Sequence, residues 1–418
     1  MVNQIVPIFA MLGSMVFLML GGGLHSVIIP IRGQIEGFST FELSSICSGW
    51  AVGFTLGCVI VPHLVHRTGH FKTFSILTAL LSINILLNAM VIDFLFWIML
   101  RAISGFCFSG CYMVAESWLN ERVNNKNRGS IFSLYMIATQ TAMMGGQYLL
   151  VIADPKSEIL FMIGAILFAV AVLPTAVSKA QSPAPLVHVS LDLRKLFCNS
   201  PSAVVGAILS GIISSAWGNF APIFGYLNGF SNARIATLLS AAMIGSILFQ
   251  YPIGKLSDVI DRRYVMVFSG LTGIAFGLLM TMLSQKEQFD MIFFLSVIGY
   301  GAVIYSVYSL VVAHANDFAN QKDFFEISNG LLILYGFGAM VGPLFTAQMI
   351  NMTGPSGIFT TTTIAHLAFA SYTIYRTYRR VKPNKDELIH LSEPVSEESL
   401  PEKKNSFPSM PTAITVKR

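Results

Sequence analysis

The stretch Gly254-Lys-Leu-Ser-Asp-Val-Ile-Asp-Arg-Arg263 decides the fold, because a related stretch lies 192 residues earlier, Pro62-His-Leu-Val-His-Arg-Thr-Gly-His-Phe-Lys72. Each is a short basic connector between two long apolar runs, the second and third in one case, the eighth and ninth in the other. Matching connectors at matching positions indicate a duplicated unit of six apolar runs. Such repeats are typical of secondary transporters, whose related halves enclose a site near the membrane midplane.

The apolar runs themselves predict a polytopic membrane protein. The chain is 54% hydrophobic and 11% charged, with a mean hydropathy of +0.66. About 20 apolar residues in a helix span the ~30 Å hydrocarbon layer, and the runs lack the period-two alternation of barrel strands. We therefore predict an all-α membrane protein with twelve transmembrane helices arranged as two pseudo-symmetric six-helix bundles. The expected spans are 5–31, 41–62, 73–92, 94–119, 130–152, 158–178, 201–223, 234–253, 264–284, 290–314, 327–350 and 356–377.

Basic residues in the connections predict the orientation, since cytoplasmic loops carry an excess of Lys and Arg. With the N-terminus cytoplasmic, twelve basic residues fall on the inner side and four on the outer side. We therefore expect both termini in the cytoplasm and the protein in the plasma membrane, the inner membrane of a bacterium. The inner residues would be Arg67, Lys72, Arg122, Lys126, Arg128, Lys179, Arg194, Lys195, Lys255, Arg262, Arg263 and Lys322. The outer ones would be Arg32, Lys156, Arg234 and Lys286.

Composition divides the chain into four parts. We expect an N-terminal six-helix bundle at 1–178, a cytoplasmic central loop at 179–200 and a C-terminal bundle at 201–378. The segment 379–418 is rich in Glu, Lys, Ser and Pro, so it lacks the apolar surface that folding needs and is expected to be a disordered cytoplasmic tail. The N-terminus has no basic region before its first apolar run, so that run is expected to be retained rather than cleaved as a signal peptide.

The five cysteines show no metal-ligand or redox spacing, and we expect them to be small packing residues. We accordingly expect no cofactor and no metal. The basic residues are spread among the connections and the tail, which does not suggest a nucleic-acid partner.

Two motifs resemble the major facilitator superfamily, and the resemblance covers all twelve spans. That family carries Gly-x-Leu-Ala-Asp-Arg-x-Gly-Arg-Lys after the second and eighth spans. The second copy here keeps Gly254, Leu256, Asp258, Arg262 and Arg263. A second family signature, Arg-x-x-x-Gly in the fourth span, occurs as Arg101-Ala-Ile-Ser-Gly105. The resemblance implies a transporter of six plus six helices and says almost nothing about its substrate.

Other stretches resemble the poorly characterised YcaD-like branch of that superfamily. They are Val114-Ala-Glu-Ser117, Asn127-Arg-Gly129, Gly146-Gln147, the run from Gln250 to Asp258, and Gly342-Pro-Leu-Phe-Thr-Ala347. The family's antiporter signature in the fifth span, Gly-Pro-x-x-Gly-Gly, is incomplete, with Thr141 and Ala142 at the Gly-Pro positions.

Arg101 is a permanent charge about 10 Å inside the outer end of the fourth span. A charge at membrane depth costs ~2.5–3.5 kcal/mol, so Arg101 should face the bundle interior with partners. Gly21, Gly22 and Gly23 of the first span fall at a similar depth and offer carbonyl acceptors. The resemblance implies contacts of this Arg with the first span and a part in proton coupling. The alternative is that its side chain merely reaches the outer surface.

Glu116 lies on the same span, roughly 22 Å along the axis from Arg101 and about 60° around it, too far for a direct pair. A carboxylate among apolar neighbours is a candidate for proton exchange near physiological pH. The alternative is an anchor at the cytoplasmic surface that pairs with Arg122 or Arg128.

The connectors supply candidate gating residues. A carboxylate beside a helix N-terminus is stabilised by the helix dipole and the free N–H groups. The resemblance implies that Asp258 holds the start of a neighbouring helix in one conformation, with Arg262 and Arg263 assisting. In the first copy Arg67 is kept, but His66 replaces the acidic residue. The alternative is that these residues only set the orientation in the membrane.

The resemblance further implies that spans one, four, seven and ten line a central cavity. Its candidate residues are His25, Tyr112, Trp217, Asn219, Tyr305 and Tyr308. Such a cavity would be aromatic and poor in fixed charge, which suits a modestly polar organic solute. Alternatively, each of these residues is a hydrogen-bonding residue in helix packing.

We therefore predict a secondary transporter of a small organic solute that works by alternating access, with proton coupling through Glu116 and Arg101, and that is a monomer. No Gly-x-x-x-x-Gly-Lys-Ser/Thr loop for an ATP-driven pump occurs, and no cluster typical of an enzyme. A non-transporting receptor or regulatory protein of the same fold remains an alternative.

Overall fold

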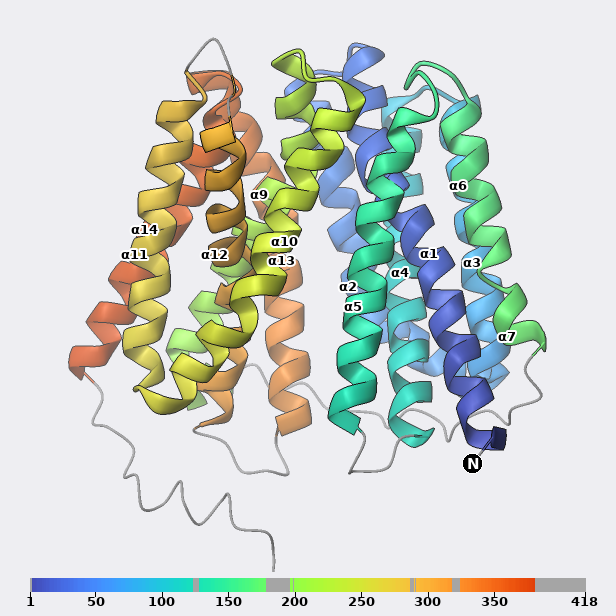
Figure 1. Cartoon of the computed structure of the whole chain (residues 1–418), viewed down its shortest axis with the longest axis horizontal. Helices are drawn as coiled ribbons and strands as arrows, with labels where there is room; N and C mark the ends of the chain where they lie inside the picture. The colour runs from blue at the N-terminus through green and yellow to red at the C-terminus, as the bar shows by residue number, and fades with distance from the viewer. Residues whose placement is uncertain are drawn as a thin grey trace, which may run out of the picture. The chain divides into compact units, whose positions relative to one another are not determined.

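The computed structural model describes residues 2–122, 128–177, 196–197, 199–285, 289, 291–317 and 324–379 (Figure 1). The regular structure of these residues is helical. The first half of the chain contains α1 (Val2–Ile35), α2 (Thr40–Thr68), α3 (His70–Met90), α4 (Phe94–Arg122), α5 (Arg128–Tyr148), the short 3₁₀ helix η1 (Leu149–Val151), α6 (Ile159–Val170) and α7 (Leu173–Val177). The second half contains α9 (Pro201–Leu227), α10 (Asn232–Val259), α11 (Arg262–Leu283), α12 (Met291–Asn316), α13 (Phe324–Thr353) and α14 (Gly357–Arg379).

Successive helices run in opposite directions, so the turns gather at two ends of the bundle (Figure 1). We call the end with the N-terminus and the turns at Gly69 and Asp261 the terminal end. The distal end carries the turns at 36–39, 91–93, 152–158, 228–231 and 354–356. Most of the predicted central loop and the predicted tail beyond Arg379 lie outside the described residues.

Within the described residues, ten helical segments are long and apolar enough to cross a membrane, the stretch Ile159–Ala176 that covers α6 and α7 being one of them. Helices α5 and α14 are not among them, because each mixes its apolar residues with Thr, Ser, Tyr, Gln or His. Both have a membrane-spanning length, at 21 and 23 residues. Every predicted span coincides with a helical segment, and the sixth, Ile159–Ala176, contains a break.

The sixth predicted span, 158–178, is interrupted. Helix α6 ends at Val170, and the short helix α7 begins at Leu173. Pro174 explains the break, because proline lacks an N–H and its ring clashes with the carbonyl four residues earlier, that of Val170.

The two connectors are shorter than predicted, because the helices continue past the apolar residues. The chain turns from α2 to α3 at Gly69 alone, with φ of +83°, a conformation that side chains other than glycine rarely adopt. Helix α10 likewise continues to Val259, where a loop had been expected from Gly254. The apolar residues show only which part of a helix lies in the hydrocarbon layer. The helix itself continues through the polar residues that follow, until a residue such as Gly69 ends it.

The tightest packing in the first half is the crossing of α2 and α4, where glycines meet carbonyls reciprocally. A Cβ atom at Gly53 of α2 would overlap the carbonyl oxygen of Ala102 on α4. A Cβ atom at Gly105 of α4 would overlap the carbonyl oxygen of Trp50 on α2. The absence of side chains therefore lets the two backbones touch, as in other close helix pairs in membranes.

The second half repeats this crossing between α10 and α12. Gly245 of α10 faces the carbonyl of Ile298, and Gly301 of α12 faces that of Ala242. The same reciprocal arrangement joins α1 to α5 and α9 to α13, through Gly23 with Met143, Gly146 with Leu20, Gly211 with Tyr335, and Gly338 with Ile208. Equivalent helices of the two halves thus pack by equivalent contacts, which is what the repeated connectors predicted.

We expect Gly53→Ala to lower the free energy of unfolding by about 1–3 kcal/mol, because the added methyl group has no space between α2 and α4. Gly254→Ala is the matched control, since a Cβ atom there meets nothing within 4 Å. Thermal unfolding in detergent, followed by the loss of the monodisperse peak, measures both. Equal melting temperatures for the two variants would contradict the close crossing.

Candidate functional site

Between the described residues, five hydrogen bonds join the first half to the second, and all five lie in the distal part of the bundle. Four link α5 and η1 to α10: Gln147 with Ser240 (3.4 Å), Gln147 with Met243 (3.7 Å), Tyr148 with Thr237 (3.0 Å), and Asn232 with the carbonyl of Leu150 (3.0 Å). The fifth links α2 to α13, where Ser48 Oγ donates to the carbonyl of Met340 (2.7 Å). We call these five contacts the distal seam.

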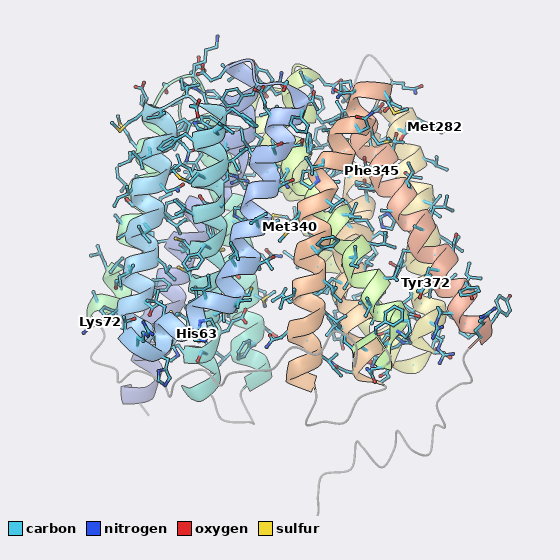
Figure 2. The ribbon with its side chains drawn as sticks, turned by 180° about the vertical axis from the view of Figure 1, so that it is seen from behind. His63, Lys72, Met282, Met340, Phe345 and Tyr372 are labelled. Atoms are coloured by element: carbon cyan, nitrogen blue, oxygen red, sulfur yellow. The ribbon has the colours of Figure 1, made fainter. Side chains whose placement is uncertain are left out.

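Toward the terminal end the same helices separate. Helices α5 and α10 lie together at the distal end and diverge toward the end that carries the N-terminus (Figure 1). From the other side, Met340 lies between α2 and α13, and His63 marks the terminal part of α2 (Figure 2). The two halves therefore meet distally and part terminally.

Arg101 lies inside the first half and is only 4% exposed, so its side chain does not reach the surface. Its Nη1 lies 3.3 Å from Nδ1 of His25 on α1, and its side chain also lies near Cys47 on α2. The predicted contact with the first span is therefore present, but it runs through His25. Gly21, Gly22 and Gly23 were expected to serve Arg101; they pack instead against Phe168, Phe108 and Met143.

An asparagine network that the sequence interpretation missed lies beside Arg101. Ser104 Oγ donates to Oδ1 of Asn84 (2.9 Å), and Asn84 Nδ2 donates to the carbonyl of Leu100 (2.8 Å). Asn88 in turn donates to the carbonyl of Asn84 (3.0 Å). Two asparagines four residues apart in the third span, hence on one helix face, were the available signal.

Glu116 is exposed, although it lies within the membrane-spanning part of α4. The hydroxyls of Tyr112, one turn earlier, and of Tyr135 on α5 are close enough to interact electrostatically with its carboxylate. Tyr112 also donates to the Met19 sulfur on α1 (3.1 Å). The expected anchors Arg122 and Arg128 have side chains outside the described residues.

The predicted cavity residues fall into two groups. His25 and Trp217 are 2% and 1% exposed, and both lie among packed helices. His25 contacts the rings of Phe108 and Phe168, and Trp217 contacts those of Tyr300 and Phe359. They are therefore interior packing residues in this conformation.

The other candidates are partly exposed. Tyr308 packs edge-on against Tyr335 of α13 at 5.0 Å, and Tyr305 of α12 also lies near Tyr335. Asn219 donates to the carbonyl of Ser215 in its own helix (2.9 Å), beside Gly218, where a Cβ atom would meet open space. Tyr335 was missed because cavity residues were predicted only on spans one, four, seven and ten, whereas Tyr335 lies on the eleventh.

The gating candidates of the second connector form a charge cluster at the terminal end. Arg262 binds Asp258 (2.9 Å) and also Asp317, which follows α12 (2.9 Å). Asp258 was expected to contact the start of a neighbouring helix. It contacts the side chain of Arg262, which is the first residue of α11. Burial raises the pKa of Asp317, Arg262 opposes that rise, and Asp258 and Asp261 add to it.

Asp261, which the sequence interpretation did not single out, caps α11 by accepting a hydrogen bond from the Arg263 backbone (3.1 Å). The Arg263 side chain is buried, whereas Arg67 is exposed near the end of α2. Among the described residues, no group of three or more His, Cys, Asp or Glu side chains is placed to hold a metal ion.

Comparison with known proteins decides the family. The model of the Major Facilitator Superfamily matches residues 11–322 and 207–407. The chain belongs to this superfamily. The membrane-spanning, twelve-helix transporter fold predicted from the sequence is thereby confirmed, and the protein is a multi-pass membrane transporter by family.

Curated relatives support the predicted branch. The chain is similar to the uncharacterized MFS-type transporter YcaD of Escherichia coli strains UMN026 and K12, at 23% identity over 352 residues, covering 82% of this chain and 89% of YcaD.

Solved structures share the superfamily fold at lower identity. A mutant of the nucleoside transporter NupG superposes with a TM-score of 0.76 at 14% identity, covering 87% of this chain and 98% of NupG. A bacterial homologue of the lysosomal transporter Spinster, inward-facing and occupied, gives 0.72 at 14% identity and covers 90% and 98%. A D-xylose–proton symporter gives 0.66 at 13% identity and covers 88% and 96%.

We expect Arg262→Met to lower the free energy of unfolding by about 1 kcal/mol, because Asp317 loses its cation while half-buried. The deficit should shrink as the pH falls, since protonated Asp317 needs no cation. Thermal unfolding in detergent at several pH values measures this. Lys255→Met, which removes the charge of an exposed side chain, is the control and should change stability by less than about 0.5 kcal/mol. A pH-independent deficit would contradict the role of Asp317.

Proposed function

We propose that this chain is a secondary transporter that moves a small organic solute across the bacterial inner membrane by alternating access between its two helical halves. The distal seam carries the proposal, because it closes one end of the interface by hydrogen bonds while the helices diverge at the other end. In alternating access, related halves rock about a central site and expose it to one side at a time.

The proposal assigns the terminal end to the cytoplasm. The excess of basic residues in the connections at that end supports this orientation. The conformation is then inward-open, with the distal seam as the closed outer gate. The central loop and the tail would also be cytoplasmic.

The solute is proposed to be small and organic. Nucleosides and D-xylose are the cargoes that the names of two structural neighbours give, and both are small organic solutes. At 14% and 13% identity these neighbours share only the fold with this chain. The proposal for its solute therefore depends on the residues of this chain. Partly exposed tyrosines on α12 and α13, together with Asn219, offer aromatic faces and hydrogen-bonding groups rather than a dense fixed charge.

Coupling to protons is proposed to depend on Arg101 and Glu116. Arg101 is a permanent cation that links α4 to His25 of α1 and lies near Cys47 of α2. Glu116 is exposed within the span and can exchange a proton with water in the inward-open state.

We expect Arg101→Ala to abolish solute flux while the protein still reaches the membrane, since the substitution removes a buried interhelical link but no surface signal. The measurement compares intracellular and extracellular metabolites of deletion cells and overexpressing cells, with flux of any responding solute then measured in proteoliposomes. Membrane abundance of the variant, determined by immunoblot of the membrane fraction, is the control. Unchanged flux in Arg101→Ala would contradict its role, and binding without flux in the unaltered protein would favour a receptor.

A crosslink between α2 and α13 tests alternating access directly. A Cβ atom at Gly336 would lie 3.6 Å from Cβ of Thr55, within the range of disulfide-bonded cysteines. We expect the oxidised double variant Thr55→Cys, Gly336→Cys to lose at least about 90% of flux and to regain it on reduction, because the two halves can no longer separate.

The two single variants, each in a background with Cys58→Ser to prevent wrong pairing, are the controls and should not respond to oxidant. Full flux by protein that is quantitatively crosslinked would rule out separation of the halves at this place.

A further inference from the structure

The strongest unexplained feature is the group of Glu116, Tyr112 and Tyr135 on α4 and α5. Glu116 lies about 9 Å inside the terminal end of α4, within its membrane-spanning part. A carboxylate facing hydrocarbon would be costly, and Tyr135 beside it is only 2% exposed. Glu116 therefore belongs to the inner side of α4, where the halves part, and its exposure is exposure to water from the terminal end.

The carboxylate has no compensating cation among the described residues. Tyr112 on α4 and Tyr135 on α5 interact electrostatically with it, Cys111 interacts with both tyrosines, and His70 on α3 bonds the adjacent Ser117 (3.0 Å). Helix α1 contributes Met19, which is uncharged. The side chains of Arg122 and Arg128 lie outside the described residues.

The hydrogen-bonding groups around Glu116 are mostly acceptors. The carboxylate accepts only, and the Tyr112 hydroxyl already donates to Met19, so its oxygen remains free to accept. The buried Tyr135 hydroxyl has no hydrogen-bond partner. Buried hydroxyls are normally satisfied, so an unpaired one beside an exposed carboxylate points to a ligand. The Tyr135 hydroxyl can donate as well as accept, but the carboxylate and the Tyr112 oxygen can only accept, and together with the negative charge they favour a ligand that is positively charged and donates hydrogen bonds.

The two tyrosine rings add to this preference, because an organic cation is attracted by the face of an aromatic ring. A second tyrosine pair, Tyr308 and Tyr335, lies on α12 and α13, the helices of the second half that correspond to α4 and α5. A phosphate or carboxylate ligand would be repelled by Glu116, and a neutral sugar would leave its charge uncompensated.

We propose that Glu116, Tyr112 and Tyr135 form a binding site for an organic cation, and that the cation and a proton exclude each other at the Glu116 carboxylate. This names the substrate class of the proposed transporter and rests on that proposed function. When a protonated amine binds, the Glu116 O–H bond breaks, the proton passes to water, and the carboxylate forms an ion pair with the ammonium group. No other reactant is needed.

Exclusive occupancy makes the transporter an exchanger. The Glu116 carboxylate changes its accessibility from one side to the other with either a proton or a cation bound, so inward proton flow drives the cation outward. In this proposal, exchange of a cation for a proton follows because both use the Glu116 carboxylate. It does not depend on the Gly-Pro pair of the antiporter signature, which the fifth span lacks.

The test uses purified full-length protein and two probes of equal shape and opposite charge, tetraphenylphosphonium and tetraphenylborate, with 2-phenylethylammonium as a hydrogen-bonding cation. Isothermal titration in weak buffer measures affinity, and a pH indicator measures proton release. We expect both cations to bind, tetraphenylborate not to bind, and up to about one proton to be released per bound cation. Affinity should fall by up to about tenfold per pH unit on the acid side.

Variants locate the site. We expect Glu116→Gln to weaken cation binding at least about tenfold and to abolish proton release, since an amide carries no charge. Tyr135→Phe should weaken 2-phenylethylammonium more than tetraphenylphosphonium, because only the former donates hydrogen bonds. Glu158→Gln, which removes an exposed carboxylate at the distal end, is the matched control and should leave both readouts unchanged.

Failure of this proposal can be told apart from failure of the transport proposal. Equal cation binding by the unaltered protein and Glu116→Gln, or no binding of either cation, overturns the cation site, whether or not Arg101-dependent flux is found. Cation binding with Glu116-dependent proton release but no flux in proteoliposomes supports the site and overturns transport. If Glu116→Gln does not fold, the contrast between the two tetraphenyl ions and the proton release of the unaltered protein still decide.

Discussion

The contact between glycine and carbonyl at four helix crossings is the constraint on which the rest of the structure depends. In a membrane the hydrophobic effect does not hold helices together, so close backbone packing must do so. The crossings α2–α4 and α1–α5 bind the core of the first half, and α10–α12 and α9–α13 bind that of the second. Close backbone contacts therefore hold the central helices of each half together, which is compatible with the proposed rocking of one half against the other.

The side chains in the interior of the first half differ in chemistry from those in the interior of the second half. The first half holds Arg101, His25 and the asparagine network of α3, together with Glu116. The second half has an aromatic interior at the corresponding places, where Trp217 packs against Tyr300 and Phe359. The interior of the first half thus carries polar and ionisable side chains where the second half carries these packed aromatic rings.

The sequence predicted the fold well because the length of the apolar spans is a physical consequence of crossing a bilayer, and the repeated connectors mark the repeated six-helix unit. It placed Arg101 in the interior for the same reason. It did not reveal that His25 and Trp217 are buried in packing, because helical periodicity gives a direction on one helix but not which neighbour covers it. Asp317, Tyr135 and Tyr335 were missed since they become significant only through partners distant in sequence. The turn was not predicted at Gly69 alone, because the polar residues before it were expected to form a loop but are helical.

The neutrality of the distal seam has a consequence for energetics. Its five hydrogen bonds involve hydroxyls, amides, thioether and backbone carbonyls, with no ion pair among them. Interhelical bonds of this kind average about 0.6 kcal/mol in membranes, so the whole set is worth only a few kcal/mol. Inverting a two-state population from 1:99 to 99:1 takes about 5.5 kcal/mol. In the proposed alternating access, the hydrogen bonds of the seam would therefore resist opening by less free energy than such an inversion takes, and as neutral contacts they would respond little to salt.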